Sequence, residues 1–261
     1  MAIPAATGQS DVDRILDTLI DQVRKNLPDQ FVGMYLYGSL SSGDFDPGSR
    51  DIDFLVVTKS ELSDAEMARL ADMHASIKAG KQPFADRLEG SYIPLDAVRR
   101  YDPEHSDHPL IGVDWDFGVI PHGWNWVLER AIIRQSGKAL AGPPPDTLID
   151  PVSPDELRAA VRHQLFDFWG NIGEPDWLGL AAYQAFSILT TCRALHTLST
   201  GTLTSKPVAA EWAGRMLGSP WKGHIAWTLE HRHDFTEHDP GPAHEFIRNT
   251  LQLVGGTEAT P

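Results

Sequence analysis

Two aspartates one residue apart, Asp51 and Asp53, are the residues of this chain best suited to metal-assisted chemistry. They flank the start of a β-branched stretch, 52–58, which predicts a strand. Side chains alternate along a strand, so both carboxylates should project from one face. Two neighbouring ionised carboxylates repel each other and need cations nearby. Magnesium binds carboxylates together with phosphate oxygens and water, and two such ions can clamp the attacking and leaving oxygens of a phosphoryl displacement.

Gly38 and Ser39 form a candidate phosphate-binding element. They follow an aromatic and β-branched stretch, 31–37, which predicts a strand, and eleven residues separate Ser39 from Asp51. A glycine here lets the backbone come close to a ligand, and the amides of the next turn can bind phosphate. Ser49 is a further candidate for that contact. An isolated Asp-x-Asp pair is commonly a solvated strand edge, but the preceding Gly-Ser favours a functional site.

A third carboxylate should complete the metal site and take a proton from the attacking hydroxyl. Glu89 lies in a third expected strand, 87–93, and suits this role. Asp86 is its competitor, but it differs from Glu89 by an odd number of residues and would face the other side of a regular strand.

The elements around these residues are of mixed type in the first hundred residues. Apolar residues at helical spacing predict helices over 10–27 and 63–79, the second with Ser63 and Glu66 as a capping pair. Together with the three expected strands they indicate an α/β domain. Residues 102–123, rich in Pro, His and Gly, predict a loop.

The second half of the chain is predicted to be helical. A helix over 124–136 and a proline-rich linker at 142–145 precede it, because proline fixes φ and removes a donor. The expected helical segments begin at Pro154, Asp176, Ser205, Pro220 and Pro242. We therefore expect an N-terminal α/β domain and a C-terminal helical domain, with the boundary between residues 101 and 151.

Composition narrows the class of partner. The formal net charge is −14, which disfavours nucleic acid and suits a cationic small molecule. No apolar run is long enough for a membrane span, and no secretory signal opens the chain. With a single cysteine, Cys192, no internal disulfide can form, so we expect a cytoplasmic protein.

Two other polar groups invite a metal interpretation but fit it less well. Asp114 and Asp116 have no Gly-Ser before them and are interpreted as loop acidity. His231 and His233 are two residues apart on an expected helix, so their side chains should not face each other.

The stretch from Tyr37 to Val57 resembles the signature of the nucleotidyltransferase superfamily related to DNA polymerase β: Gly-Ser, a spacer, Asp-x-Asp and a distant acid. More narrowly, the chain resembles the aminoglycoside (3'')(9)-adenylyltransferase family. Its second half supplies that family's motifs in order, namely Leu140-Ala-Gly-Pro-Pro, Asp150-Pro-Val, Arg193, Ser205-Lys206 and Ala210-Glu211-Trp212-Ala213.

The resemblance implies an α+β protein that transfers AMP from ATP to a hydroxyl of a streptomycin- or spectinomycin-type acceptor. A nucleotidyltransferase domain with a small mixed sheet would span residues 1–150, and a helical domain that completes the ATP and acceptor sites 151–261. We expect a monomer that binds ATP, two Mg²⁺ ions and a cationic small molecule, but neither nucleic acid nor membrane.

Residue roles follow from the same resemblance. Asp51, Asp53 and Glu89 would hold Mg²⁺, with Glu89 also the catalytic base. The remaining roles are divided between ATP, contacted by Gly38, Ser39, Ser49, Arg193, Lys206 and Trp227, and the acceptor, contacted by Trp169 and Asp176.

The chain departs from the family pattern at two points. Arg50 separates Ser49 from Asp51, and the last acidic acceptor position falls near Tyr183. Two alternatives to the leading function therefore stay open. One is an adenylyltransferase for another metabolite, a protein side chain or RNA, and the other is a non-catalytic nucleotide-binding regulator.

Overall fold

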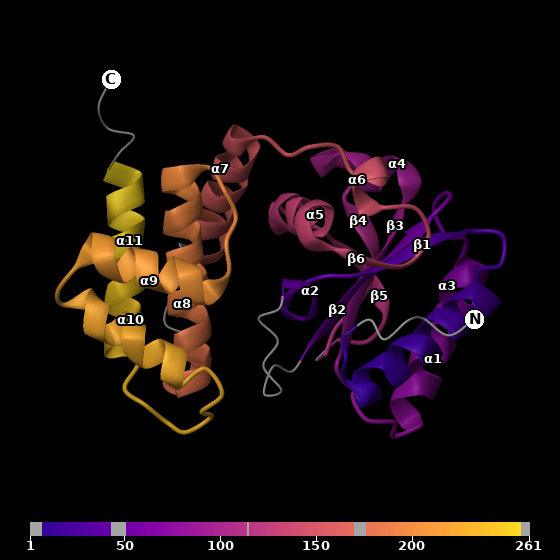
Figure 1. The fold of residues 1–261 in the computed structure, drawn as a ribbon, viewed down its shortest axis with the longest axis horizontal. Helices are drawn as coiled ribbons and strands as arrows, with labels where there is room; N and C mark the ends of the chain where they lie inside the picture. The colour runs from indigo at the N-terminus through magenta and orange to yellow at the C-terminus, as the bar shows by residue number, and fades with distance from the viewer. Residues whose placement is uncertain (1–6, 43–50, 114, 170–175, 257–261) are drawn as a thin grey trace. The chain divides into compact units, whose positions relative to one another are not determined.

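The computed structural model describes residues 7–42, 51–113, 115–169 and 176–256. The chain forms two compact units, Met1–Pro151 and Val152–Pro261. The first unit, drawn from indigo to pink in Figure 1, consists in chain order of α1 (Ser10–Asn26), β1 (Phe31–Leu36), α2 (Ser39–Ser42), β2 (Ile52–Thr58), α3 (Asp64–Ala79), β3 (Leu88–Pro94), α4 (Leu95–Arg99), the 3₁₀ turn η1 (Pro103–His105), β4 (Asp107–Ile111), β5 (Gly118–Pro121), α5 (Asn125–Ser136), β6 (Lys138–Ala141) and α6 (Pro145–Leu148).

The six strands of this unit form one mixed sheet in the order β5-β4-β3-β2-β1-β6. Only β2 and β3 are parallel, and α3 makes the crossover between them. The other four pairings are antiparallel. The C-terminal ends of β1 and β4 therefore lie at the same edge of the sheet as the N-terminal ends of β2 and β3.

Helices cover both faces of the sheet (Figure 1), and the strand period of two decides which residues each face receives. Even-numbered strand residues such as Met34 and Phe54 pack with α1 and α3 in one hydrophobic core. Odd-numbered residues such as Leu55 and Ile93 pack on the other side with Trp126 of α5. Asp53 and Glu89 are odd-numbered, so they belong to the face that α5 covers.

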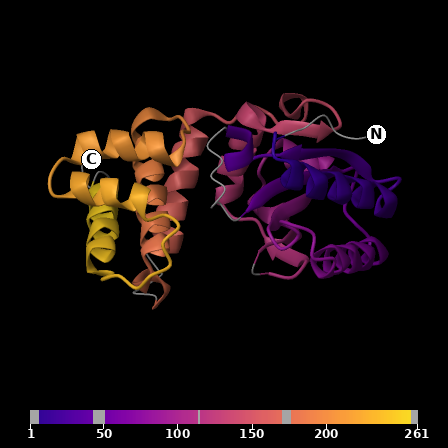
Figure 2. The ribbon, with the colours of Figure 1, turned by 60° about the horizontal axis from the view of Figure 1, so that its bottom comes forward.

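Helices and helical turns make up the described part of the second unit, beside an isolated β-bridge between Leu180 and Glu237 (Figure 2). They are α7 (Pro154–His163), the π-helical turn η2 (Gln164–Trp169), the 3₁₀ turn η3 (Asp176–Gly179), α8 (Ala181–Thr200), α9 (Lys206–Leu217), α10 (Trp221–Glu230) and α11 (Gly241–Gly256). Helix α8 is central and contacts α7, α9, α10 and α11. The small side chains of Ala209, Ala210 and Ala213 let α9 approach it closely, and Cys192 is fully buried in this core. Within the described part of the chain, no helix is long and apolar enough to cross a membrane.

The α+β prediction is confirmed, and so are the strand over 52–58 and the capping box at Ser63 and Glu66. The loop predicted for residues 102–123 is wrong, because β4 and β5 lie there. Both strands are short and contain proline, and their hydrogen bonds come from pairing with each other and with β3 rather than from a local pattern.

Smaller corrections concern the ends of helices. The segment from Asp176 is a four-residue 3₁₀ turn, and the long helix after it begins only at Ala181. His231 and His233 follow the end of α10 at Glu230, so they do not lie on a helix as predicted. Part of the expected proline-rich linker belongs to α6, which begins at Pro145.

The capping box of α7 predicts a stability effect. The Ser153 hydroxyl accepts a hydrogen bond from the Glu156 amide at 3.2 Å, and the Glu156 carboxylate accepts one from the Ser153 amide at 2.8 Å. We expect Ser153→Ala to lower the free energy of unfolding by about 1 kcal/mol. Ser205→Ala is the matched control, because Ser205 occupies the same position before α9 without a side-chain capping bond. Equal losses in chemical denaturation would show that the capping bond is not the cause.

Candidate active site

The centre of the candidate site is a pair of carboxylates on adjacent strands. In the parallel register of β2 and β3, Asp53 is the direct partner of Glu89. Both side chains therefore lie next to each other on the same face, at the N-terminal ends of their strands. Asp51 immediately precedes β2 at the same edge. The structure thus brings all three predicted acids to one edge of the sheet.

Gly38 makes room for this carboxylate pair. It follows β1 with φ of +68°, in the left-handed region that favours glycine. A Cβ placed on Gly38 would lie 1.9 Å from Oδ2 of Asp53, so any side chain there would collide with the carboxylate. The residue before Gly38 is also bonded to this strand, because the Tyr37 amide donates a hydrogen bond to the Asp53 carbonyl at 3.0 Å. Ser39 comes next, as the first residue of α2.

A further carboxylate, Glu129 of α5, lies close to this pair. Its Oε1 accepts a hydrogen bond from the Asn125 side chain at 3.0 Å, and its Oε2 accepts one from the Tyr37 hydroxyl at 3.4 Å. Burial, and then the negative charge of Glu89, raise the pKa of Glu129 to about 7. Burial, and then Glu129, Asp53 and Glu89, raise the pKa of the Tyr37 hydroxyl, which places these three acids within electrostatic reach of one phenol.

The turn between β4 and β5 lies at the same edge of the sheet, since Ile111 pairs with Gly90. It carries Trp115, which is 65 % exposed. Single exposed apolar side chains are common on protein surfaces, but this indole is accessible and so is a candidate platform for a flat or apolar group.

In the second unit, the predicted phosphate contacts Arg193 and Lys206 belong to packed neighbours, α8 and α9. The Lys206 ammonium lies over the Phe186 ring, 4.6 Å from its centroid. Phe186 and Arg193 are two helical turns apart and share one face of α8. Arg193 is half-buried, and burial lowers the pKa of its guanidinium. No carboxylate of the described residues forms an ion pair with Arg193.

The predicted ATP-binding aromatic, Trp227 of α10, stacks on histidine rings. The ring centroids of His231 and His238 lie 4.3 and 4.6 Å from that of Trp227, at interplanar angles of 17° and 23°. His224, one turn earlier on α10, is parallel to the indole at 5.6 Å. The indole is therefore already part of a stack.

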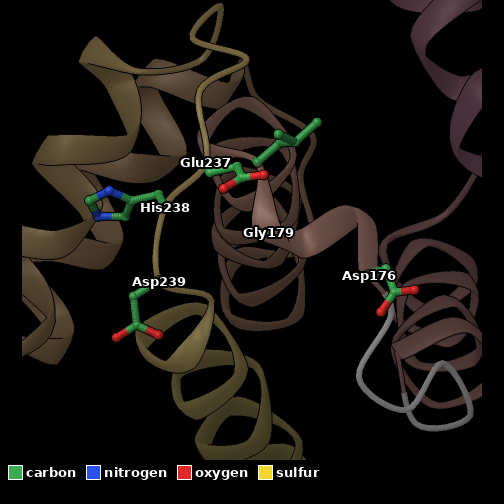
Figure 3. A pocket seen from close by; sticks show the side chains of 6 residues that line it. Asp176, Gly179, Glu237, His238 and Asp239 are labelled. Atoms are coloured by element: carbon green, nitrogen blue, oxygen red, sulfur yellow. The ribbon is translucent and has the colours of Figure 1, made fainter.

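His238 also joins Trp227 to the predicted acceptor residue Asp176. A cavity of about 440 Å³ in this unit is lined by Asp176, Gly179, Leu180, Glu237, His238 and Asp239. Figure 3 shows that Glu237, His238 and Asp239 come from one chain segment, before α11, whereas Asp176 comes from η3. Three carboxylates give this cavity a negative lining.

Other predicted site residues cannot be placed as fully. Ser49 lies outside the described residues. The backbone of Trp169 ends η2, but its side chain lies outside the described part. The competitor Asp86 lies in a turn before β3 and pairs with Arg87 at 3.6 Å. In the described ranges, no three His, Cys, Asp or Glu side chains form a group that could hold a metal ion.

Four residues of these sites were not singled out for them from the sequence. Glu129 belongs to no motif and Tyr37 only opens the signature stretch, and the odd-numbered face of the sheet and the helix that covers it bring them to the acids. His238 and Trp115 likewise belong to no motif. An exposed tryptophan between two strands would have been a signal, had the strands been recognised.

Both units are similar to known protein domains. Residues 16–106 match the model of a nucleotidyltransferase domain, and residues 147–252 match the model of the aminoglycoside adenylyltransferase C-terminal domain. An aminoglycoside (3'')(9) adenylyltransferase of Shigella flexneri is 25% identical over 226 residues, with 82% of each chain covered. A spectinomycin 9-adenylyltransferase of Staphylococcus aureus is 29% identical over 195 residues, with 70% of each chain covered.

A solved structure shares the fold. The crystal structure of the spectinomycin adenyltransferase AAD(9) from Enterococcus faecialis, with ATP and spectinomycin, matches with a TM-score of 0.74 at 17% identity, covering 93% of this chain and 98% of that one. The domain that matches the nucleotidyltransferase model carries Asp53 and Glu89 as partners in the strand register. The protein is therefore a nucleotidyltransferase, and thus an enzyme. It combines this domain with the C-terminal domain of its narrower group and belongs to the aminoglycoside adenylyltransferase family.

The contact between Gly38 and Asp53 predicts the effect of a single methyl group. We expect Gly38→Ala to lower the free energy of unfolding by about 1–2 kcal/mol, because alanine is strained at this φ, and to displace the Asp53 carboxylate. Gly223→Ala is the control, since a Cβ there meets nothing within 4 Å. Thermal unfolding and nucleotidyl transfer measure the two effects. Full stability and activity in Gly38→Ala would contradict the described contact.

The raised pKa of Glu129 predicts a pH-dependent stability. Between its ordinary pKa of 4.5 and about 7, the folded protein holds a proton that the unfolded chain has lost. Stability therefore falls as the pH rises through this window. We expect Glu129→Gln to be more stable than the wild type above pH 7, with a difference that vanishes below pH 4.5.

Glu66→Gln serves as the comparison, because the contribution of Glu66 to stability depends on pH in the opposite direction. The hydrogen bonds from Ser63 lower the pKa of Glu66, so its contribution is present at neutral pH and is lost as the pH falls through the lowered value. Chemical denaturation of both variants from pH 4 to 8 measures the differences. A difference for Glu129→Gln that does not change with pH would contradict the charge assignment.

Proposed function

We propose that the protein transfers AMP from ATP to a hydroxyl group of an aminoglycoside or aminocyclitol of the streptomycin or spectinomycin type. The hydroxyl oxygen forms a bond to the α-phosphorus, the bond from that phosphorus to the β-phosphate oxygen breaks, and pyrophosphate leaves. Glu89 accepts the hydroxyl proton. The proposal rests on one observation: Asp53 and Glu89 are direct partners in the register of β2 and β3, and Gly38 lies against the Asp53 carboxylate. The chain that carries them matches both family domains.

The acids at this sheet edge fit magnesium by their chemistry. Asp51, Asp53 and Glu89 present only oxygen donors, which Mg²⁺ prefers, and the aligned pair is the kind of anionic site that attracts a divalent ion. These three residues would hold Mg²⁺, which when bound stabilises charge on the attacking and leaving oxygens. Asp51 and Asp53 would serve as its ligands, and Glu89 would in addition accept the proton of the acceptor hydroxyl.

ATP contacts are proposed from both units. Gly38, Ser39 and Ser49 contribute backbone and hydroxyl groups to the triphosphate. Arg193 and Lys206 supply positive charge, and the lack of a carboxylate partner for Arg193 among the described residues leaves its guanidinium suited to a phosphate. Trp227 offers its indole to the adenine, which would join or displace the stacked imidazole rings of His231 and His238.

Acceptor contacts are proposed for Trp169 and Asp176. The cavity beside Asp176 is lined by two more carboxylates, Glu237 and Asp239, which suits a cationic molecule. The relatives named for spectinomycin and for aminoglycosides support this class of acceptor. We further propose that the enzyme is monomeric and cytoplasmic.

Pyrophosphate release tests the proposed reaction. Purified protein with Mg²⁺ and ATP is assayed against streptomycin, spectinomycin, kanamycin and no acceptor, with mass spectrometry to detect the AMP adduct. We expect release with streptomycin or spectinomycin, and a fall of about a hundredfold or more in Asp53→Asn. Asp72→Asn, an exposed position on α3, is the control and should keep full activity.

Each outcome of that assay is decisive. Full activity in Asp53→Asn would overturn the metal assignment. If ATP binds but no antibiotic of the panel is modified, the acceptor is of another class and the antibiotic part of the proposal is wrong. If no transfer occurs with small molecules, RNA or protein, the regulatory alternative holds instead.

A further inference from the structure

Glu129 is a carboxylate at the catalytic edge of the sheet to which the proposed reaction gives no role. It lies on α5, the helix that covers the sheet face carrying Asp53 and Glu89. Glu129 as a residue is half-buried. Glu129 accepts a hydrogen bond from the Tyr37 hydroxyl, and the Tyr37 amide donates to Asp53, the register partner of Glu89.

The carboxylate accepts hydrogen bonds from two neutral groups. Asn125, one helical turn earlier, donates to Oε1, and the Tyr37 hydroxyl donates to Oε2. Tyr37 is itself tied to the catalytic strand, since its amide donates to the Asp53 carbonyl. Each carboxylate oxygen accepts one of these bonds and has a second lone pair for a further donor. Glu129 is therefore positioned relative to Asp53, but its charge is not neutralised by either partner.

The described basic side chains are engaged elsewhere or lie away from Glu129. In the part of the chain that the structure describes, no Lys, Arg or His forms an ion pair with Glu129. The adjacent Arg130 directs its guanidinium to the carbonyl groups of Val98 and Arg99, at 3.1 and 2.6 Å. A partly buried carboxylate next to another one costs free energy unless a cation approaches.

Two uses of such a carboxylate can be compared. As a purely structural group it would only satisfy Tyr37 and Asn125, which requires hydrogen-bond acceptors but no approach to a ligand. As a metal ligand it would add to an oxygen set that three acids already supply. A cationic acceptor explains the remaining features, namely the charge, the spare lone pairs, the partial exposure and the nearness to Glu89.

We propose that Glu129 binds an ammonium or guanidinium group of the acceptor and so places the acceptor hydroxyl beside Glu89. The inference rests on the proposed function and deepens it by naming a residue that selects for positive charge. Glu129 touches the acceptor and not the reacting atoms, so its contribution appears in acceptor binding. Binding of ATP and of Mg²⁺ does not depend on it.

Glu129→Gln tests the inference, because glutamine keeps the size and one hydrogen-bond acceptor but removes the charge. We expect the KM for streptomycin or spectinomycin, and the Kd of the same compound by calorimetry without ATP, to rise about tenfold or more. The KM for ATP and the Mg²⁺ concentration for half-maximal rate should stay unchanged. Glu129→Asp should restore part of the acceptor affinity, and Glu104→Gln, an exposed position on η1, should have no effect.

The outcomes separate the inference from the function on which it rests. An active wild type with unchanged acceptor KM and Kd in Glu129→Gln overturns the inference and leaves the function intact. A change confined to the Mg²⁺ requirement also overturns it, in favour of a metal ligand. A wild type that neither binds nor modifies any cationic acceptor overturns the proposed function and the inference together. Thermal unfolding of each variant shows whether a loss of affinity reflects a loss of folded protein.

Discussion

The repulsion between two carboxylates that the backbone holds side by side governs the first unit of this enzyme. The parallel register of β2 and β3 makes Asp53 and Glu89 direct neighbours, and neither can move away without breaking the ladder. Like charges in this position cost free energy. Gly38 has no side chain where the Asp53 carboxylate lies. Nearby, the Tyr37 hydroxyl donates a hydrogen bond to Glu129 of α5. Binding of the proposed magnesium ions would offset this cost.

In the second unit, a positive charge rather than a negative one is held at a cost in free energy. Arg193 is held half-buried on α8, where burial lowers the pKa of the guanidinium, so the helix keeps a positive charge at a cost. A nucleotide is a polyanion and this chain has a formal net charge of −14, so local cations of this kind have to be built into the fold. In the proposed function Arg193 supplies such a charge to the phosphates of ATP.

Much of this arrangement can be predicted from the sequence, for reasons that are local. The apolar face of α1, the β-branched run of β2 and the Ser63–Glu66 capping pair all depend on residues close together in the chain. The spacing of Gly38, Ser39, Asp51 and Asp53 also indicates the chemistry. The register that makes Asp53 face Glu89 does not follow from local pattern, because it depends on how α3 returns the chain to the sheet.

What the sequence does not reveal depends on long-range pairing. Strands β4 and β5 are hidden in a segment rich in proline and histidine, and only their partners make them strands. Glu129 is in sequence an ordinary helical glutamate, and its position beside Tyr37 depends on which face of the sheet α5 covers. The position of His238 likewise depends on the segment before α11, which brings this residue to both Trp227 and the cavity.

The buried cysteine of the second unit has a practical consequence. Cys192 is fully enclosed where α8, α9, α10 and α11 meet, and burial raises the pKa of its thiol to about 12. Alkylating reagents need the exposed thiolate, so they cannot modify this residue while the helices remain packed. Since it is the only cysteine of the chain, thiol labelling in native buffer acts as a clock for the opening of the helical core, and the slowing of that clock by a ligand would measure how strongly the ligand holds these helices together.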